Sequence, residues 1–293
     1  MNTATTDRSL AILTWRAPVT LARTLNALAP ITHLFSERLV VCQESDPEEI
    51  RLAEQAGYTA IGTVDNLGIQ GGLKHAVESA KAKRVLLLEN DCHFLGDAEG
   101  FERLLDRADQ LMDTHPIRFV KMFPHTNQSV RRCLRYWRLE NGRLKRTLRG
   151  HLLRNEADWL LCRTIRVVPD EILEIHPIKP QGDRLFLTNS RYCPWSNRTN
   201  YLDRNFFLEE LIPFAERNPA KRVFNEKQDL EHCINPSKRR GWWRKKRFPI
   251  LDVHPDFFGH FRLDRPEDDE KNLRGATENW MPRFESTNDP DPH

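Results

Sequence analysis

Four short apolar segments alternate with amphipathic helical segments in the first third of the chain, and no other feature restricts the possible folds as strongly. The apolar segments cover residues 9–14, 38–42, 58–63 and 84–88. The helical segment after the second of them opens on Ser45-Asp46-Pro47, with an early proline and following acids, and stops at Gly57. Strands that alternate with helices over short links predict an α/β fold with a parallel sheet covered on both faces.

Polar residues follow each of the four apolar segments. The first is followed by Trp15-Arg16, the second by Gln43-Glu44, the third by Asp65-Asn66 and the fourth by Glu89-Asn90-Asp91. Parallel sheets bind ligands outside the carboxyl ends of their strands. We therefore expect these polar side chains to converge on one binding edge.

Glu89-Asn90-Asp91 is the most informative of these strand ends. Two carboxylates one residue apart repel each other unless a cation lies between them. Oxygen ligands of this kind suit Mg²⁺ or Mn²⁺, which commonly also bind substrate phosphates. The segment therefore predicts a divalent-metal site, and the alternative is a solvated strand end.

These stretches together resemble the nucleotide-sugar-binding half of family 2-type glycosyltransferases with the GT-A fold. The resemblance is carried by residues 12–16, 40–46, 66–69 and 86–91. It implies a GT-A-like, Rossmann-like fold with a mostly parallel central sheet flanked by helices and a less regular acceptor-side half. The implied divisions are a nucleotide-sugar-binding half at 1–125, an acceptor-binding and catalytic half at 126–262, and an acidic tail at 263–293.

The resemblance also implies a metal site for Mn²⁺ or Mg²⁺. The family's "DxD" element reads Glu-Asn-Asp here, so Asp91 is the expected metal ligand and Glu89 the weaker one. His93 is an alternative, because Asp91-Cys92-His93 is a D-x-H variant. A histidine near the carboxyl terminus completes the metal site in many such enzymes. Here His260 fits that role, with His254 as its competitor.

The same resemblance assigns a nucleotide pocket to the strand ends. The family's second-strand acid, which contacts the base, maps onto Glu44 or Asp46. The expected pocket residues are Thr14, Arg16, Glu44, Asp46 and Asn66.

The second half carries a candidate catalytic base. The segment 225–231 resembles the family's "ED" element, but Gln228 replaces the acid before Asp229. The assignment therefore stays between Asp229 and Glu231. A carboxylate suits the role because it can accept the proton of an attacking hydroxyl. The alternative is an exposed helix start, where acids are favoured in any case.

A loop rich in aromatic and amide groups is the candidate contact for the donor sugar and the acceptor. Within residues 192–198, Trp195 and Asn197 are the expected contacts, because aromatic faces and amides match the two kinds of surface on a sugar. The alternative is a proline-containing loop anchored by a half-buried tryptophan.

Charge is strongly segregated although the chain has 45 Lys+Arg and 42 Asp+Glu, a net charge of only +3. Residues 131–154 and 238–247 are basic, and the last thirty residues are acidic. The second basic stretch fits a solvated loop, a clamp for a diphosphate leaving group, or an anionic membrane contact with Trp242 and Trp243 near the headgroups. The first could meet an acidic polymer. No nucleic-acid motif is present and a pI of about 8.5 is only mildly basic, so no nucleic-acid partner is expected.

The remaining features favour a cytoplasmic enzyme. No segment approaches the ~18–20 apolar residues of a membrane span, the first residues do not read as a signal peptide, and the six cysteines form no C-x-x-C pair. The prediction is a hexosyltransferase-type enzyme that uses a UDP- or GDP-type sugar donor and a glycan, polysaccharide or lipid-linked hydroxyl acceptor. Inversion is implied by the resemblance, and peripheral contact with the inner face of a membrane stays open. The alternatives are a nucleotidyltransferase acting on sugar phosphates and a non-enzymatic binding protein for nucleic acid or an acidic polymer.

Overall fold

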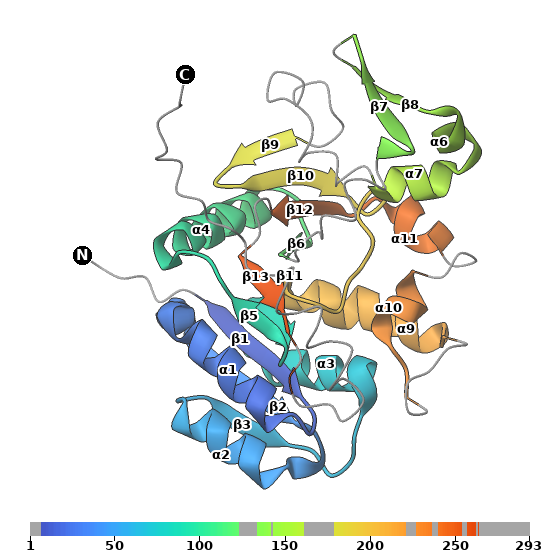
Figure 1. Cartoon of the computed structure of the whole chain (residues 1–293). Helices are drawn as coiled ribbons and strands as arrows, with labels where there is room; N and C mark the ends of the chain where they lie inside the picture. The colour runs from blue at the N-terminus through green and yellow to red at the C-terminus, as the bar shows by residue number, and fades with distance from the viewer. Residues whose placement is uncertain are drawn as a thin grey trace.

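A nine-stranded sheet forms the centre of the computed structural model, which describes residues 7–122, 134–141, 143–160, 179–220, 227–235, 240–253, 257–261 and 263. Its strands are β1 (Arg8–Thr14), β2 (Glu37–Cys42), β3 (Thr59–Gly62), β4 (Arg84–Glu89), β6 (Phe119–Lys121), β9 (Lys179–Gly182), β10 (Leu185–Asn189), β11 (Asn200–Asp203) and β12 (Pro249–Val253). Their order is β3-β2-β1-β4-β11-β6-β12-β10-β9 (Figure 1). Among these strands, only β10 and β11 run against the common direction.

Two small antiparallel sheets lie beside the central one. The first pairs β5 (Cys92–Phe94) with β13 (Phe258–His260), and the second pairs β7 (Trp137–Glu140) with β8 (Arg143–Arg146). The second sheet is a hairpin, and Asn141 at the end of β7 has the positive φ of 51° that such a tight turn requires.

Helices flank the central sheet and the β7–β8 hairpin (Figure 1). They are α1 (Pro18–Leu28), α2 (Pro47–Gln55), α3 (Gly68–Ser79), α4 (Ala98–Thr114), α6 (Leu148–Leu152), α7 (Arg154–Leu160), α9 (Ile212–Arg217), α10 (Leu230–Ile234) and α11 (Arg240–Lys246). Short 3₁₀ turns cover Ala29–Leu34 and Gln43–Ser45, and a π-helical turn, Phe206–Leu211, precedes α9. The predicted α/β fold with a mostly parallel central sheet flanked by helices is therefore confirmed.

Alternate residues of the strands build one core on each face of the sheet. In β1, Leu10 and Ile12 join the core formed with α1 and α4, whereas Ala11 and Leu13 join the core formed with α3. This follows from the period of two in a strand that is buried on both sides. Each fully buried leucine or isoleucine contributes about 2 kcal/mol relative to an exposed one.

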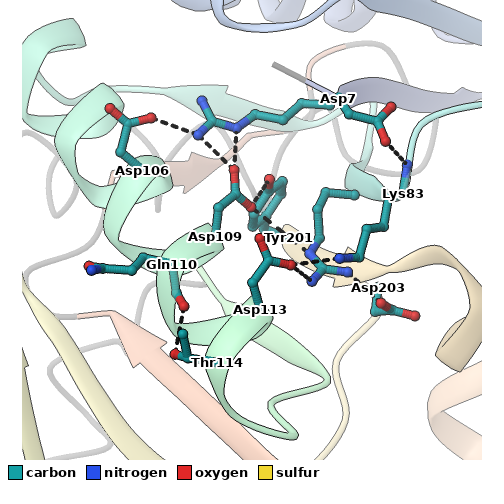
Figure 2. A network of polar contacts seen from close by, with 11 residues as sticks. Asp7, Lys83, Asp106, Asp109, Gln110, Asp113, Thr114, Tyr201 and Asp203 are labelled. Atoms are coloured by element: carbon teal, nitrogen blue, oxygen red, sulfur yellow. Dashed lines mark hydrogen bonds and ion pairs between the residues drawn. The ribbon is translucent and has the colours of Figure 1, made fainter. Parts of the chain in front are cut away.

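A cluster of charged groups fastens α4 to the sheet at the start of β1 and β4. This α4 cluster consists of Arg8, Arg84, Asp106, Asp109, Asp113, Tyr201 and Asp203 (Figure 2). Arg8 donates to Asp109 and Asp106, both at 2.7 Å, and Arg84 pairs with Asp203 and with Asp113. Burial raises the pKa of Tyr201 well above its ordinary value, so its hydroxyl stays protonated and donates to Asp109 at 2.6 Å.

The central sheet takes strands from both of the expected halves, since β6 lies between β11 and β12. Of the expected tail at 263–293, only residue 263 is among the described residues. No helix in the described ranges is long and apolar enough to span a bilayer.

Candidate active site

Asp91 and His260 come together at the carboxyl end of β4. His260 Nε2 lies 3.0 Å from Asp91 Oδ2, and the Asp91 side chain is almost fully buried. The two residues meet because β13 pairs with β5, which places His260 opposite Cys92, and because the Phe261 amide donates to the Asp91 carbonyl at 2.8 Å. Glu89 is half-buried at the last position of β4, two residues before Asp91.

Aromatic packing holds β13 in this position. Phe257 and Phe258 of this segment pack against Phe94 and Phe101, with ring centroids between 5.2 and 6.2 Å apart within this group. A buried aromatic cluster gives a rigid support, so the position of His260 does not depend on a mobile loop.

His93 lies next to the pair. Its ring is 7% exposed and meets the ring of Phe261 edge to face at 4.8 Å. Burial lowers the pKa of His93, although the backbone and the charge of Asp91 oppose this shift. Its buried Nδ1 has no hydrogen-bond partner among the described residues. A neutral imidazole with a free nitrogen is the form that binds metals. His254 falls outside the described residues.

The distance between Asp91 and His260 fits two neighbouring ligands of one cation. Adjacent ligands of an octahedral Mg²⁺ at about 2.1 Å lie about 3.0 Å apart. Within the described ranges, no group of three or more His, Cys, Asp or Glu side chains is arranged to hold a metal alone. Mg²⁺ commonly takes one or two protein ligands and completes its shell with substrate phosphates and water. The pair therefore fits a metal that is shared with a phosphate-bearing substrate.

A buried glutamate organises the end of β1. Glu49 Oε1 accepts from the Thr14 hydroxyl at 2.6 Å and from the Ala17 amide at 2.8 Å. Asn90, between the two candidate acids, donates to Thr14 Oγ1 at 2.9 Å. The hydroxyl of Thr14 thus joins the ends of β1 and β4, and its side chain is 1% exposed.

Glu44 connects the ends of β1 and β2. It accepts from Trp15 Nε1 at 3.0 Å and forms an ion pair of 2.7 Å with Arg16 Nε. Both charged residues have positive φ, 61° for Glu44 and 49° for Arg16. Such a backbone is costly outside glycine and is often kept at functional sites.

Asp46 and Asn66 fix the starts of two helices. Asp46 accepts from the amides of Glu48 and Glu49, which makes it the N-cap of α2. Asn66 accepts from the Gly68 amide at 2.7 Å where α3 begins. The structure thus gathers four of the five expected nucleotide residues at the strand ends, and gives Asp46 a capping role beside them.

The expected base and the expected sugar contacts share one hydrogen-bond network. The side-chain Nδ2 of Asn197 donates to Asp229 Oδ1 at 2.8 Å, and the backbone N–H of Asn197 donates to Glu231 Oε1 at 2.9 Å. Asp229 also caps α10 and lies 3.3 Å from His232 Nδ1 through its Oδ2. Trp195 donates through Nε1 to Asn197 Oδ1 at 3.2 Å. Its ring is 1% exposed, so in this structure it offers no open face to a sugar.

Two connections bring this network to the carboxyl edge of the sheet. Asn200 pairs with Leu87 near the end of β4, and at most about 11 Å of backbone separates Asn197 from it. The Gln70 amide in the first turn of α3 donates to the Gln228 carbonyl at 3.1 Å. Asp229 is therefore held close to the start of α3 as well as to the loop that enters β11.

Gly68 permits the second of these connections. Its φ is +71°, and a Cβ added there would lie only 2.3 Å from Lys227 Cβ. A larger residue would push the segment that carries Asp229 away from α3. Nothing in the sequence indicates this contact of Gly68.

The two tryptophans of the second basic stretch pack against other aromatic side chains, Trp243 fully buried and Trp242 partly buried. Trp243 is fully buried and donates through Nε1 to the Cys193 carbonyl at 2.9 Å, and Trp242 stacks on Phe214 at 3.9 Å. The burial of Trp243 does not match an indole at lipid headgroups, and the membrane contact of this stretch stays a prediction.

Sequence reasoning missed Glu49 and Asn90. An acid in the first turn of a helix is explained by the helix dipole alone, so nothing in the sequence marks Glu49 as buried. Asn90 was only the spacer between two acids. Their joint contact with Thr14 depends on the pairing of β1 with β4.

Several solved structures are similar to this chain. Glucosyl-3-phosphoglycerate synthase from Mycobacterium tuberculosis with Mg²⁺ and uridine diphosphate has 12% identity, covers 89% of this chain and 73% of that chain, and gives a TM-score of 0.48. The same enzyme with Mn²⁺, UDP-glucose and phosphoglyceric acid has 14% identity, covers 89% of this chain and 73% of that chain, and gives a TM-score of 0.45. A mannosyltransferase from Pyrobaculum calidifontis with GDP-Man and Mn²⁺ has 12% identity, covers 41% of this chain and 36% of that chain, and gives a TM-score of 0.35. These are distant likenesses.

No model of a protein family matches the sequence, and no curated protein matches it.

Proposed function

We propose that this chain is a metal-dependent glycosyltransferase that moves a sugar from a nucleotide-diphosphate sugar to a hydroxyl acceptor. The observation that carries the proposal is the contact between Asp91 and His260 at the carboxyl end of β4. A hydrogen-bonded carboxylate, Asp229, is tied to the same edge through Asn197. A cation site and a base at one sheet edge match the needs of group transfer from a diphosphate.

Asp91 and His260 would hold Mn²⁺ or Mg²⁺, with Glu89 beside them and His93 as the reserve ligand. When bound, the cation supplies Lewis-acid stabilisation of the diphosphate leaving group. Asp91 is buried and is held by the paired strands, so the protein does not have to reorganise to bring it to the diphosphate.

Thr14, Arg16, Glu44 and Asn66 would line the pocket of a UDP- or GDP-type nucleotide. Thr14 is fixed from both sides by Glu49 and Asn90, so it would act mainly by setting the shape of the β1 turn. Arg16 is the exposed cation of this group, with a side chain that is 66% exposed, and Glu44 fixes its direction. Asp46 would support the pocket as the cap of α2.

Asp229 is favoured over Glu231 as the base that accepts the hydroxyl proton of the acceptor. Its Oδ1 is occupied by Asn197 and by the Glu231 amide, and these contacts aim Oδ2 towards His232. Glu231 is engaged in holding the Asn197 amide. Asn197 would thus position the base, and Trp195 would support Asn197 from inside the core. A glycan or lipid-linked hydroxyl remains the proposed acceptor, and direct displacement with inversion the proposed course.

A thermal-shift panel of UDP- and GDP-sugars with and without Mn²⁺ tests the proposal, because a ligand that binds the folded state raises its stability by mass action. We expect at least one donor to stabilise the wild type only with Mn²⁺, and Asp91→Asn to lose that effect. Glu99→Gln, at an exposed position of α4, is the matched control and should keep it. Stabilisation by no donor, or an undiminished effect in Asp91→Asn, would contradict the proposal.

A further inference from the structure

Three arginines surround one buried aspartate away from the Asp91–His260 pair. Asp158 of α7 is fully buried, and it pairs with Arg146 of β8, with Arg191 at 3.1 Å and with Arg244 of α11 at 2.7 Å. We call these four residues the Asp158 cluster. Together they carry a formal charge of +2, so the aspartate neutralises only part of the charge that it gathers.

Each arginine is placed by a buried neighbour rather than by the aspartate alone. Trp137 anchors the hairpin of Arg146 by donating to the Ala157 carbonyl at 2.7 Å. Buried Ser190 and Trp243 are hydrogen-bonded to each other, which fixes the backbone next to Arg191 and Arg244. The arginine positions are therefore built into the fold, which is the condition for binding without a large ordering cost.

Donor capacity in the cluster exceeds the acceptor capacity of Asp158. A guanidinium has five N–H donors, whereas one carboxylate has about four lone-pair sites. Arg146 Nε is buried and has no hydrogen-bond partner in the described part of the chain. A buried donor without a partner is costly, and an anion that reaches the cluster would satisfy it.

The guanidinium groups are partly open to solvent and lie on aromatic faces. The side chains of Arg146, Arg191 and Arg244 are 23%, 34% and 13% exposed. Arg146 lies 5.2 Å from the centre of the Trp137 ring, and Arg191 lies 5.7 Å from that of Tyr192. Stacking on an aromatic ring restricts the orientation of the guanidinium plane. A guanidinium with a fixed orientation can donate two parallel hydrogen bonds to the oxygens of a phosphate or carboxylate.

The Asp158 cluster is separate from the Asp91–His260 pair. Four strand spacings separate β4 from β10, the strand before Arg191, which is about 19 Å at the usual spacing. Moreover, β10 ends where Asn189 pairs with Pro249 at the start of β12, whereas Asp91 follows the opposite, carboxyl edge. In Figure 1, α7 and α11 lie together on the side away from β1 and α1.

We propose that Arg146, Arg191 and Arg244, held by Asp158, form a binding site for a phosphoryl group. The proposal does not depend on the proposed glycosyl transfer. The phosphoryl group can belong to a free phosphorylated molecule or to a phospholipid headgroup. The second source is included because Leu148 and Leu152 on the neighbouring α6 are 79% and 76% exposed, and exposed leucines beside arginines suit an anionic membrane surface.

Calorimetry with inorganic phosphate, at an ionic strength matched with NaCl, tests the site directly. Arg191→Gln is the primary variant because its side chain is the most exposed of the three. We expect it to weaken phosphate binding about tenfold, since a charge-assisted contact is lost. Arg118→Gln is the matched control. Arg118 is 39% exposed, pairs with Glu210 at 3.8 Å and lies over the ring of Phe206, so its loss should leave phosphate binding unchanged.

Sedimentation with phosphatidylcholine vesicles, with and without phosphatidylglycerol, separates the two sources. Binding of phosphate without vesicle binding assigns a free phosphorylated ligand. Binding to the anionic vesicles alone, lost in Arg191→Gln, assigns a headgroup. If Arg191→Gln does not fold, Arg146→Lys tests the same point, because lysine keeps the positive charge but lacks the paired N–H donors of the guanidinium. Binding of neither probe to the wild type, or equal binding to all variants, would overturn the proposal.

Discussion

The α4 cluster and the Asp158 cluster use the same chemical groups in opposite proportions. In the α4 cluster, two nearly buried arginines face four aspartates, and Asp106 and Asp113 turn towards solvent with 62% and 56% exposure. In the Asp158 cluster, one fully buried aspartate faces three partly exposed arginines. The first is closed around its cations and fastens a helix. The second leaves cationic donors at the surface, where an anion can reach them.

We infer that the ratio of donors to acceptors, rather than the number of ion pairs, separates a structural cluster from one that can bind an anion. A buried charge must be paired wherever it occurs. Which partner is in excess then decides the sign of the charge offered to solvent. Predictions for single residues of each kind test this comparison.

The largest effect is expected when the buried cation of the α4 cluster is removed. Arg84→Met leaves Asp203, Asp109 and Asp113 without a guanidinium that is only 5% exposed. Breaking a buried pair from one side should lower the free energy of unfolding by about 3 kcal/mol. Urea denaturation measures it, and a loss below about 1 kcal/mol would show that the α4 cluster is not the closed structural element described above.

Glu49 provides a buried carboxylate with no ion pair among the described residues. Burial raises the pKa of Glu49 above its usual value of 4.5. The folded state then holds the proton more tightly than the unfolded state, so the contribution of Glu49 to stability is fully present below about pH 4.5 and is lost as the pH rises through the folded-state pKa.

Glu49→Gln should therefore remove this loss and flatten the dependence of stability on pH above 4.5. Urea denaturation between pH 4 and 8 measures it. An unchanged slope in the variant would show that another group governs this range.

A smaller effect is expected for the arginine-rich cluster. Arg191→Gln leaves Asp158 with two arginines, so the free energy of unfolding should fall by only about 1 kcal/mol. The Arg118→Gln control should change it by no more than about 0.5 kcal/mol. A loss in Arg191→Gln as large as that in Arg84→Met would remove the distinction between the two clusters.

The smallest effect is expected for Lys83, which shares Asp113 with Arg84. Lys83 and Asp113 are both 56% exposed and their charges lie 2.6 Å apart. An exposed pair of this kind contributes about 0.5 kcal/mol or less. Lys83→Met beside Arg84→Met thus compares an exposed and a buried partner of the same carboxylate, in the same denaturation experiment.

The first half of the fold was predictable because its signals are local. Strands, helix starts and polar strand ends can each be recognised from a few neighbouring residues, such as the apolar segments and Pro47. The parallel strands then bring the polar ends together. The contact of Asp91 with His260 was expected only through a family resemblance. No local pattern shows that β13 pairs with β5.

The second half was less predictable because its contacts are long-range. Trp195 reads in the sequence as a loop aromatic, and only the packing of Phe119, Phe207 and Trp243 around it shows that it belongs to the core. Asp158 gave no signal at all. Its ion pairs form only because β8, α7 and α11 pack together in the fold. The residues involved are far apart in the sequence, and no sequence pattern indicates that they are in contact.

The central claim is that Asp91 and His260 act together on a cation that is shared with a nucleotide diphosphate. Calorimetry of UDP with and without Mn²⁺ on the wild type, Asp91→Asn, His260→Gln and the double variant tests it most directly. The account predicts Mn²⁺-dependent UDP binding that each single variant weakens at least about tenfold, with little further loss in the double variant. Binding that is independent of Mn²⁺, or unchanged in both single variants, would contradict it.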